Sequence, residues 1–523
     1  MAFRQLPTER SLGRVASQRR GRDTRGTVVI EPNNRSADTD ATDGHHGPPT
    51  DAAEVASRIA RRLGRIWDRD LTVRAARVLP AGASRTTYAV VLGDEAVDGR
   101  GDATADEAVI VRAVPSAAPG DGGLDSEVRV LRAAVDAGVP VPEVLDVSDS
   151  ADDDNIFGFP YAVLRFVDGE SIPRRILRDE AFAPIRDDFA RQAGEILARV
   201  HRMDPNPTGL SPLGDPLDAL RTLFPVEYAQ APAGLVIAMD WLDRHRPEPS
   251  PTSVVHGDFR LGNLLITSDR ISSVLDWELA HLGDPMEDLG WLCAKAWRFG
   301  VARPVAGMGT RAELLDAYAE VSGRRPTEET LRWWELYATV RWGLICGAQA
   351  NRHLDGSERS MELAAIGRRS AEQEFDALLT LGAATPLPTP DPLDDGTVAT
   401  GDAATEEPHG APTMLQLLES VSGFLVDEVG ADDGVSPQVR FRTRVATNVI
   451  ATVRRQLLLG DRQAKESRRR LAGLGVSDGA ALVDALRDGT LSAADDTVLS
   501  VVTAEVTDRL LVANPRHLSR PDC

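Results

Sequence analysis

Short apolar runs separated by turn-forming segments dominate the chain between residues 71 and 169. Four of these runs are rich in β-branched and aromatic residues and predict strands, at residues 71–78, 87–92, 108–114 and 159–169. Val128, Leu131 and Val135 instead recur at helical spacing, which predicts an amphipathic helix between the third and fourth runs. We therefore expect a small β-rich region that contains one helix.

Most of the remaining chain has apolar residues at helical spacing. Five long helices are predicted first, at residues 189–201, 287–299, 311–322, 327–352 and 360–381. Residues 383–412 are rich in Pro, Thr, Asp and Gly, which predicts a flexible linker. Four more helices are predicted beyond it, at residues 414–425, 439–459, 480–486 and 493–511. The pattern thus indicates a helical region, a linker and a small all-α region.

Between the first two long helices lie two short apolar runs, residues 264–266 and 271–275, joined by a polar turn. They predict a β-hairpin, which would place Asn263, before its first strand, beside Asp276, after its second. Asp258 precedes Asn263 in the loop that leads into the hairpin. This order of an Asp, an Asn and a second Asp matches the catalytic centre of kinase-like phosphotransferases.

Each of these three residues suits one task in phosphoryl transfer, which needs a positioned hydroxyl and neutralised phosphate charge. Asp258 is the candidate for the carboxylate that accepts the hydroxyl proton. Asn263 and Asp276 offer the oxygen ligands that Mg²⁺ prefers. An isolated Asp at a strand end is usually a turn or cap residue, so the prediction depends on the joint pattern and not on one position.

The motifs around these residues resemble the aminoglycoside phosphotransferase family, which includes aminoglycoside and choline kinases. They are most similar to the branch whose kinase domain is also found fused to acyl-CoA dehydrogenases. The motifs that carry the resemblance are His256-Gly257-Asp258-Phe259-Arg260, Leu275-Asp276-Trp277-Glu278-Leu279-Ala280, Trp333-Trp334-Glu335, Arg341-Trp342 and Gly367-Arg368-Arg369. The similarity spans about residues 55 to 382.

This resemblance implies a two-lobed protein-kinase-like fold, ATP as the donor, Mg²⁺ as the metal and a small-molecule hydroxyl as the acceptor. It gives Asp258, Asn263 and Asp276 the roles stated above and makes His256 a structural brace for the catalytic loop. Asp284 and Asp288 are expected to cap the next helix. The C-terminal region resembles an all-helical domain of no assigned activity that accompanies some phosphotransferases of this branch.

The nucleotide phosphates are expected to bind near a small-residue turn, residues 80–85, which connects two predicted strands. Gly82 and Ser84 are our candidates there, because backbone N–H groups of a tight loop can cover phosphates. The alternative is an ordinary hairpin turn, since the loop has a single glycine. Its place in the order of elements favours the first interpretation.

The third predicted strand carries Arg112 where protein kinases have a lysine that holds the α- and β-phosphates. The chain has only two lysines, Lys295 and Lys465, and neither lies in this region. Arginine grips phosphate with parallel N–H bonds and is common here in the related branch, so Arg112 is expected to bind phosphate and to pair with Glu127. The alternatives are a solvated edge-strand arginine and a helix-surface glutamate.

Composition narrows the functional classes further. The formal net charge of −21 argues against a nucleic-acid-binding body, and no apolar run approaches the length of a membrane span. The scattered Cys293, Cys346 and Cys523 form no ligand or disulfide pattern, which fits a reduced, cytoplasmic setting. Residues 1–50 are polar and Arg-rich, and we expect a disordered tail, with a mitochondrial-type presequence as the alternative.

We therefore expect an α+β chain with a β-rich N-lobe, a helical C-lobe and a small all-α domain. The expected segments are a tail (1–50), an N-lobe that binds nucleotide (51–168), a C-lobe with the catalytic loop and acceptor site (169–382), a linker (383–412) and a helical domain (413–515). The predicted function is an ATP- and Mg²⁺-dependent O-phosphotransferase acting on a small metabolite. The related branch suggests a hydroxyacyl-CoA as that acceptor.

Two other functions stay open. One is a nucleotide-binding regulator with little catalysis, a pseudokinase that docks a partner through the helical module; the missing lysine supports it. The other is an aminoglycoside or choline-type kinase. No nucleic-acid or membrane partner is expected, while the C-terminal helical domain is a candidate surface for an oligomer or a protein partner.

Overall fold

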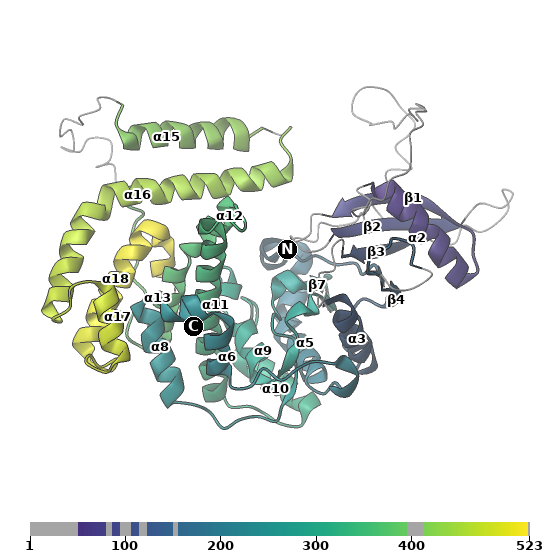
Figure 1. Cartoon of the computed structure of the whole chain (residues 1–523), viewed down its shortest axis with the longest axis horizontal. Helices are drawn as coiled ribbons and strands as arrows, with labels where there is room; N and C mark the ends of the chain where they lie inside the picture. The colour runs from purple at the N-terminus through teal and green to yellow at the C-terminus, as the bar shows by residue number, and fades with distance from the viewer. Residues whose placement is uncertain are drawn as a thin grey trace. The chain divides into compact units, whose positions relative to one another are not determined.

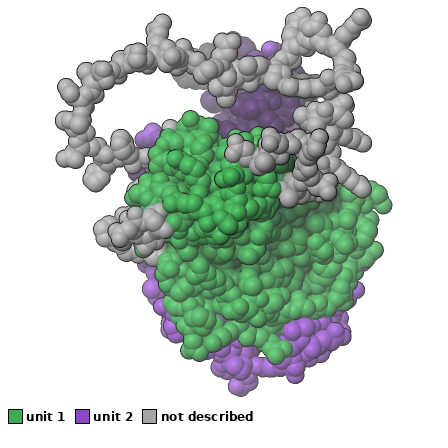
Figure 2. Space-filling model, turned by 90° about the vertical axis from the view of Figure 1, so that its right-hand side faces the viewer, with its two compact units in different colours: residues 1–210, 256–280 green, residues 211–255, 281–523 purple. Residues whose placement is uncertain are grey.

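The computed structural model of the chain describes residues 51–79, 86–94, 106–114, 123–149, 155–394, 412–432 and 434–520 (Figure 1). The chain divides into two compact units, coloured separately in Figure 2. The first contains residues 1–210 and 256–280, and the second contains residues 211–255 and 281–523. The loop and hairpin with the candidate catalytic residues thus belong to the same unit as the N-terminal sheet, so the expected boundary at residue 168 does not coincide with this division.

The first unit contains a five-stranded antiparallel sheet with the strand order β1-β2-β3-β5-β4. Its strands are β1 (Leu71–Leu79), β2 (Thr86–Asp94), β3 (Glu107–Ala113), β4 (Val144–Ser148) and β5 (Tyr161–Arg165). The four runs predicted as strands are confirmed, although the last is shorter than expected. The sequence pattern did not predict β4, which pairs with β5 at the edge of the sheet.

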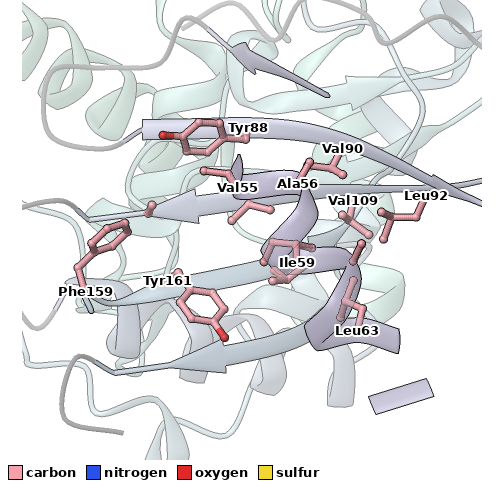
Figure 3. Close-up of a cluster of buried hydrophobic side chains, with 14 residues drawn as sticks. Val55, Ala56, Ile59, Leu63, Tyr88, Val90, Leu92, Val109, Phe159 and Tyr161 are labelled. Atoms are coloured by element: carbon pink, nitrogen blue, oxygen red, sulfur yellow. The ribbon is translucent and has the colours of Figure 1, made fainter. Parts of the chain in front are cut away.

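One face of this sheet is covered by α2 (Ala52–Trp67), and Figure 3 shows the apolar cluster between them. Val55, Ile59 and Leu63 of this helix pack with alternate residues of the strands, such as Tyr161 and Val163. Because side chains alternate along a strand, Ala162 faces the other way and packs against Leu124 and Val128 of α3 (Gly123–Asp136). The predicted helix α3 is confirmed, whereas α2 was not predicted.

The predicted β-hairpin is confirmed as β7 (Leu264–Ile266) paired with β8 (Ile271–Val274). The helix α5 (Ala183–Val200) holds its turn through Gln192, whose side-chain oxygen accepts from the Ile271 N–H at 2.9 Å. The Gln192 amide also donates to the Asp269 carbonyl at 2.9 Å. On the other strand, Glu170 and Ile266 exchange backbone hydrogen bonds. The hairpin is therefore anchored on both sides.

The remaining elements of the first unit are short. They are α4 (Pro173–Arg178), η1 (Glu180–Phe182), η2 (Asn206–Thr208), η3 (Leu261–Asn263) and η4 (Trp277–Leu279). The helix α3 contacts both η2 and η4. Since η4 follows Asp276 directly, α3 lies next to the end of the hairpin.

The second unit is mainly helical and surrounds the long helix α11 (Glu328–Leu354), which contacts α7, α8, α9, α12 and α13. Its first elements are α6 (Pro216–Leu223), α7 (Pro225–Ala229), α8 (Ala233–Arg244), β6 (Ser253–Val255), β9 (His281–Gly283), α9 (Met286–Cys293), η5 (Lys295–Arg298), α10 (Arg311–Ser322), α12 (Met361–Gly367) and α13 (Ser370–Thr380). The helices expected at 287–299 and 360–381 are each interrupted, so each forms two shorter elements.

The C-terminal region consists of α15 (Met414–Phe424), η6 (Leu425–Gly430), α16 (Pro437–Gly473), α17 (Gly479–Arg487), α18 (Asp496–Ala513) and η7 (Pro515–Ser519). All four predicted helices are present, although α16 is much longer than expected. The first residues of the expected linker are held by this region, because the Leu387 N–H donates to the Leu518 carbonyl and Asp391 pairs with Arg455. Residues 395–411 lie outside the described residues.

One hydrophobic core joins this C-terminal region to the helices before it. Ile237 of α8 and Phe375 of α13 share a cluster with Val502, Val506 and Leu510 of α18. An ion pair also joins the two regions, because Glu374 of α13, which is 1% exposed, pairs with Arg509 of α18. The architecture as a whole confirms the expected α+β class, with a β-rich region followed by a helical region and an all-α region.

The shared core predicts a large cost for truncating Leu510, which is fully buried in α18. We expect Leu510→Ala to lower the free energy of unfolding by about 2–5 kcal/mol, because it leaves a cavity in the common core. Chemical denaturation followed by circular dichroism measures the change. Leu223→Ala, at a residue that is 55% exposed on α6, is the control and should change stability by less than about 0.5 kcal/mol. Equal effects of the two substitutions would contradict the shared core.

Candidate active site

The loop before the hairpin is fixed by His256, whose side chain is fully buried. Its Nδ1 accepts from the Asp258 backbone N–H at 3.1 Å, and its Nε2 lies 3.0 Å from the Leu275 carbonyl oxygen. Because Nδ1 accepts, the ring proton must sit on Nε2, which donates to Leu275. The ring thus ties the start of the loop to the residue before Asp276, which is the bracing role that the family resemblance implied.

The next residue, Gly257, has a backbone conformation that requires glycine. Its φ is +80°, and a Cβ atom at this position would lie 2.5 Å from the Leu279 carbonyl oxygen. The loop therefore passes so close to η4 that no side chain fits. This close approach brings the segments before and after the hairpin together.

The carboxylate of Asp258 is half-buried, and both of its oxygens accept a hydrogen bond from the same loop. Arg260 Nε donates to Oδ1 at 2.9 Å, and Asn263 Nδ2 donates to Oδ2 at 2.6 Å. Asn263 Nδ2 also donates to the Asp258 carbonyl at 3.0 Å. Two donors hold this carboxylate in one orientation, as a proton-accepting group requires.

Asp276 follows the second strand of the hairpin, at the end where Asn263 precedes the first strand. The Leu275 N–H donates to the Asn263 carbonyl at 2.8 Å, which aligns the residue before Asp276 with Asn263. Asp276 itself has φ 67° and ψ 66°, a left-handed conformation that costs a non-glycine residue roughly 1–2 kcal/mol. Such strained positions cluster at functional sites. The hairpin therefore brings the two predicted metal ligands to the same edge.

The chemistry of these two side chains fits Mg²⁺. Since the Asn263 amide nitrogen is used by Asp258, its oxygen is the end that remains for a metal. The Asp276 carboxylate accepts no hydrogen bond from the described residues, so both of its oxygens are available to a metal. Mg²⁺ is usually held by one or two protein oxygens plus phosphate and water. Within the same described part of the chain, no group of three or more His, Cys, Asp or Glu residues could form an all-protein metal cage.

Arg112 and Glu127 form the ion pair that the sequence predicted, between β3 and α3. The Glu127 side chain is 4% exposed, so it is not the solvated helix-surface residue of the alternative interpretation. The Arg112 side chain is 18% exposed and opposite Ala162 in the sheet. Glu127 thereby orients Arg112 on the sheet face that carries α3. Gly82 and Ser84, the other two candidates for phosphate binding, lie outside the described residues.

Sequence reasoning missed two features of this site. Arg260 was quoted as part of the motif without a role, yet it donates a hydrogen bond to the Asp258 carboxylate. Gly262 leaves room for the Arg260 side chain, because a Cβ at position 262 would lie 2.4 Å from Arg260 Nη1. The need for glycine at position 257 was also not predicted. The sequence feature that could have indicated both is the motif itself, which places two glycines and several polar or charged residues within eight positions.

Several other residues have structural roles. Asp284 accepts from the Met286 and Ser250 N–H groups, each at 2.9 Å, and so caps the start of α9. Arg341 is buried against the Trp291 ring and pairs with Glu287 at 2.8 Å. Burial raises the pKa of the Cys346 thiol to about 12, which excludes it as a nucleophile at neutral pH.

Comparison with known protein families supports two assignments. The model of the phosphotransferase enzyme family matches residues 75–334. The model of a domain of unknown function, DUF6285, matches residues 433–517. None of the helices in the described parts of the chain has the length and apolar character needed to cross a membrane.

Two curated relatives resemble part of this chain. Acyl-CoA dehydrogenase family member 10 of Mus musculus is 32% identical over 205 residues, which make up 36% of this chain and 18% of the relative. Acyl-CoA dehydrogenase family member 11 of Gallus gallus is 30% identical over 281 residues, 48% of this chain and 35% of the relative. The chain thus matches only a minor part of the length of either protein.

Among solved structures, a macrolide 2'-phosphotransferase from Brachybacterium faecium is 20% identical to this chain. The superposition covers 60% of this chain and 96% of that protein, with a TM-score of 0.40.

The geometry of Gly257 predicts that a single methyl group disturbs the loop. We expect Gly257→Ala to lose about 1–2 kcal/mol of stability from its left-handed backbone, plus about 1–3 kcal/mol from the clash with Leu279. Gly138→Ala is the matched control, since Gly138 has φ +72° and no atom within 4 Å of an added Cβ. Denaturant titration of both variants measures the difference. A smaller loss for Gly257→Ala than for the control would refute the close approach.

Proposed function

We propose that this chain transfers a phosphoryl group from ATP, with Mg²⁺, to a hydroxyl group of a small metabolite, because residues 75–334 match the model of the phosphotransferase enzyme family. The observation that carries the proposal is the arrangement of Asp258, Asn263 and Asp276 around one hairpin edge. A module that only bound nucleotide would need neither an oriented proton acceptor nor its two neighbouring oxygen ligands.

Asp258 is proposed to accept the proton of the acceptor hydroxyl as that oxygen attacks the phosphoryl group. Its orientation is set by Arg260 and Asn263, so the carboxylate can align the hydroxyl without reorganising during the reaction. Positioning and electrostatic stabilisation supply most of the rate enhancement in phosphoryl transfer. Asp258 is thus the catalytic residue, and Arg260 is a positioning residue that acts through it.

Asn263 and Asp276 are proposed to hold Mg²⁺. When bound, the metal neutralises charge on the phosphate oxygens. The backbone bond between Leu275 and Asn263 keeps the two side chains in register, and the Asn263 amide links this pair to Asp258. The proton acceptor and the metal ligands therefore move as one structural unit.

Arg112 is proposed to replace the missing lysine as the phosphate-binding cation. Glu127 holds it through an ion pair, and the charged fork of arginine retains further N–H groups that can bind a phosphate. Gly82 and Ser84 remain proposed phosphate contacts through their backbone N–H groups. The same substitution of lysine by arginine favours the second candidate function, a regulator that binds nucleotide without turnover.

The proposed acceptor is a hydroxyacyl-CoA or a related hydroxy acid. The support is that the two curated relatives are named acyl-CoA dehydrogenase family members. Incubation of the enzyme with ATP and a pool of hydroxyacyl compounds, aminoglycosides and choline, followed by mass spectrometry, tests this choice. A gain of one phosphate on an aminoglycoside or choline, and on no hydroxyacyl compound, would refute it while leaving the kinase activity established.

The role of Asp258 predicts that Asp258→Asn lowers kcat by about 10²–10⁴-fold, because the amide cannot accept the hydroxyl proton. Nucleotide affinity should stay unchanged, as measured by calorimetry with Mg²⁺ and a non-hydrolysable ATP analogue. Asp269→Asn, in the exposed turn of the same hairpin, is the matched control and should retain full turnover. Undiminished activity of Asp258→Asn would remove it from the catalytic role.

The role of Arg112 predicts that Arg112→Ala weakens nucleotide binding by about 10–100-fold, since a charge-assisted hydrogen bond is lost. Arg112→Lys keeps the charge and should recover part of that affinity. Calorimetry on both variants distinguishes this role from a solvated arginine, whose removal would leave nucleotide affinity unchanged. Wild-type protein that binds nucleotide but transfers no phosphate to any acceptor would support the regulator.

A further inference from the structure

The helix α15 is an apolar helix without a single buried side chain. Six of its residues are large and apolar: Met414, Leu415, Leu417, Leu418, Val421 and Phe424. Its main contacts in the described chain are with α16 and η6, and Figure 1 shows it running beside α16. A helix this apolar needs a second surface to cover it, because one narrow contact leaves most of its side chains in water.

The apolar residues of α15 form two stripes. Leu415 and Leu418 belong to the inner stripe, which is half-buried. The outer stripe consists of Met414, Leu417, Val421 and Phe424, which are 56%, 53%, 50% and 52% exposed. The outer residues are spaced three, four and three apart, which is the spacing of the apolar seam in a coiled coil.

The helix α16 carries a matching stripe. Val439, Val453 and Leu457 are 46%, 42% and 43% exposed, and Ile450 lies between them on the same helical face. This face adjoins the side of α16 that contacts α15, where Arg454 pairs with Glu419. Since the two helices run antiparallel, the helical angles place both exposed stripes on one face of the hairpin. We call this face the hairpin surface.

The size of the hairpin surface suits a stable protein interface. Its seven exposed apolar side chains present roughly 600–700 Å² to solvent, close to the ~800 Å² that each partner contributes to a standard interface. This area exceeds the largest apolar patch of most monomers, ~300–600 Å². An interface of this size is therefore expected to be occupied.

The charges around the hairpin surface indicate its occupant. From Met414 to Gly430 the chain carries Glu419, Asp427 and Glu428 and no Lys or Arg. In contrast, α16 has ten Lys or Arg residues and only Asp461 and Glu466 as acids. Glu419 already pairs with Arg454 of its own hairpin, so Asp427 and Glu428 of η6 are the acids that remain for a second copy. The net negative charge of the segment Met414–Gly430 in one copy is thus complementary to the net positive charge of α16 in another. A surface that carries both halves of a complementary pair fits a two-fold contact with itself.

We propose that the hairpin surface is a homodimerisation site, in which the α15–α16 hairpins of two copies pair about a two-fold axis as a four-helix bundle. The outer stripe of each α15 then packs on the exposed stripe of the partner's α16, with the acidic and basic helices alternating around the bundle. This assembly would give a function to the domain whose family model has none.

Sedimentation equilibrium of the full chain at micromolar concentration tests the proposal. The wild-type protein should show twice its chain mass of 56.3 kDa. The variants Leu417→Glu and Val453→Glu, one on each helix, should each show the single-chain mass, since a charge in the seam is costly to bury. Gln416→Glu is the control, because it adds the same charge beside the stripe and retains the capping role of this position.

Circular dichroism checks that each variant keeps its helices. If one of the two variants unfolds, the other one alone suffices for the test. A wild-type protein that stays at the single-chain mass overturns the proposal, even if the surface binds some other protein. A folded Val453→Glu or Leu417→Glu variant that remains dimeric also overturns it. Phosphotransfer per chain should be unchanged in the variants, so the failure of this proposal is distinguishable from failure of the proposed activity.

Discussion

A single buried imidazole determines the geometry of the candidate active site. His256 accepts a hydrogen bond from the backbone of Asp258 and donates one to the backbone of Leu275, so one ring connects the two ends of the catalytic segment. A protonated ring has no acceptor nitrogen, and a ring with the other tautomer would lose both bonds. The placement of the loop that carries Asp258 against the strand that leads to Asp276 depends on this connection.

Local spacing was enough to predict the parts of the site that are close in sequence. The hairpin, with Asn263 and Asp276 at one edge, followed from two apolar runs and a turn, because strand pairing across a short loop leaves few alternatives. The pairing of Arg112 with Glu127 followed from the order of the elements. The bond from Arg260 to Asp258 did not, because the direction of a long side chain within a loop depends on the space that Gly262 leaves free.

Features that depend on distant partners were harder to predict. The strand β4 contains Asp146, a buried carboxylate that reads as a loop residue until Arg62 and the Tyr161 hydroxyl are found to satisfy it. The sequence pattern predicted a helix over residues 360–381 but no buried acid within it. Glu374 is buried because Arg509 lies against it, more than a hundred residues further along the chain. No local pattern contains such information.

The same contact constrains how this protein can change over evolutionary time. Burial raises the pKa of the Glu374 carboxyl, while Arg509 opposes that shift, so the charge of one region is tolerable only in the presence of the other. A gene that lost the last hundred codons would encode a catalytic region with acidic side chains and apolar positions such as Phe375 newly exposed to water. The coding segments for the catalytic region and for the C-terminal helical region are therefore expected to be inherited, duplicated and lost together. An enzyme that lost the C-terminal region would need compensating replacements along α13.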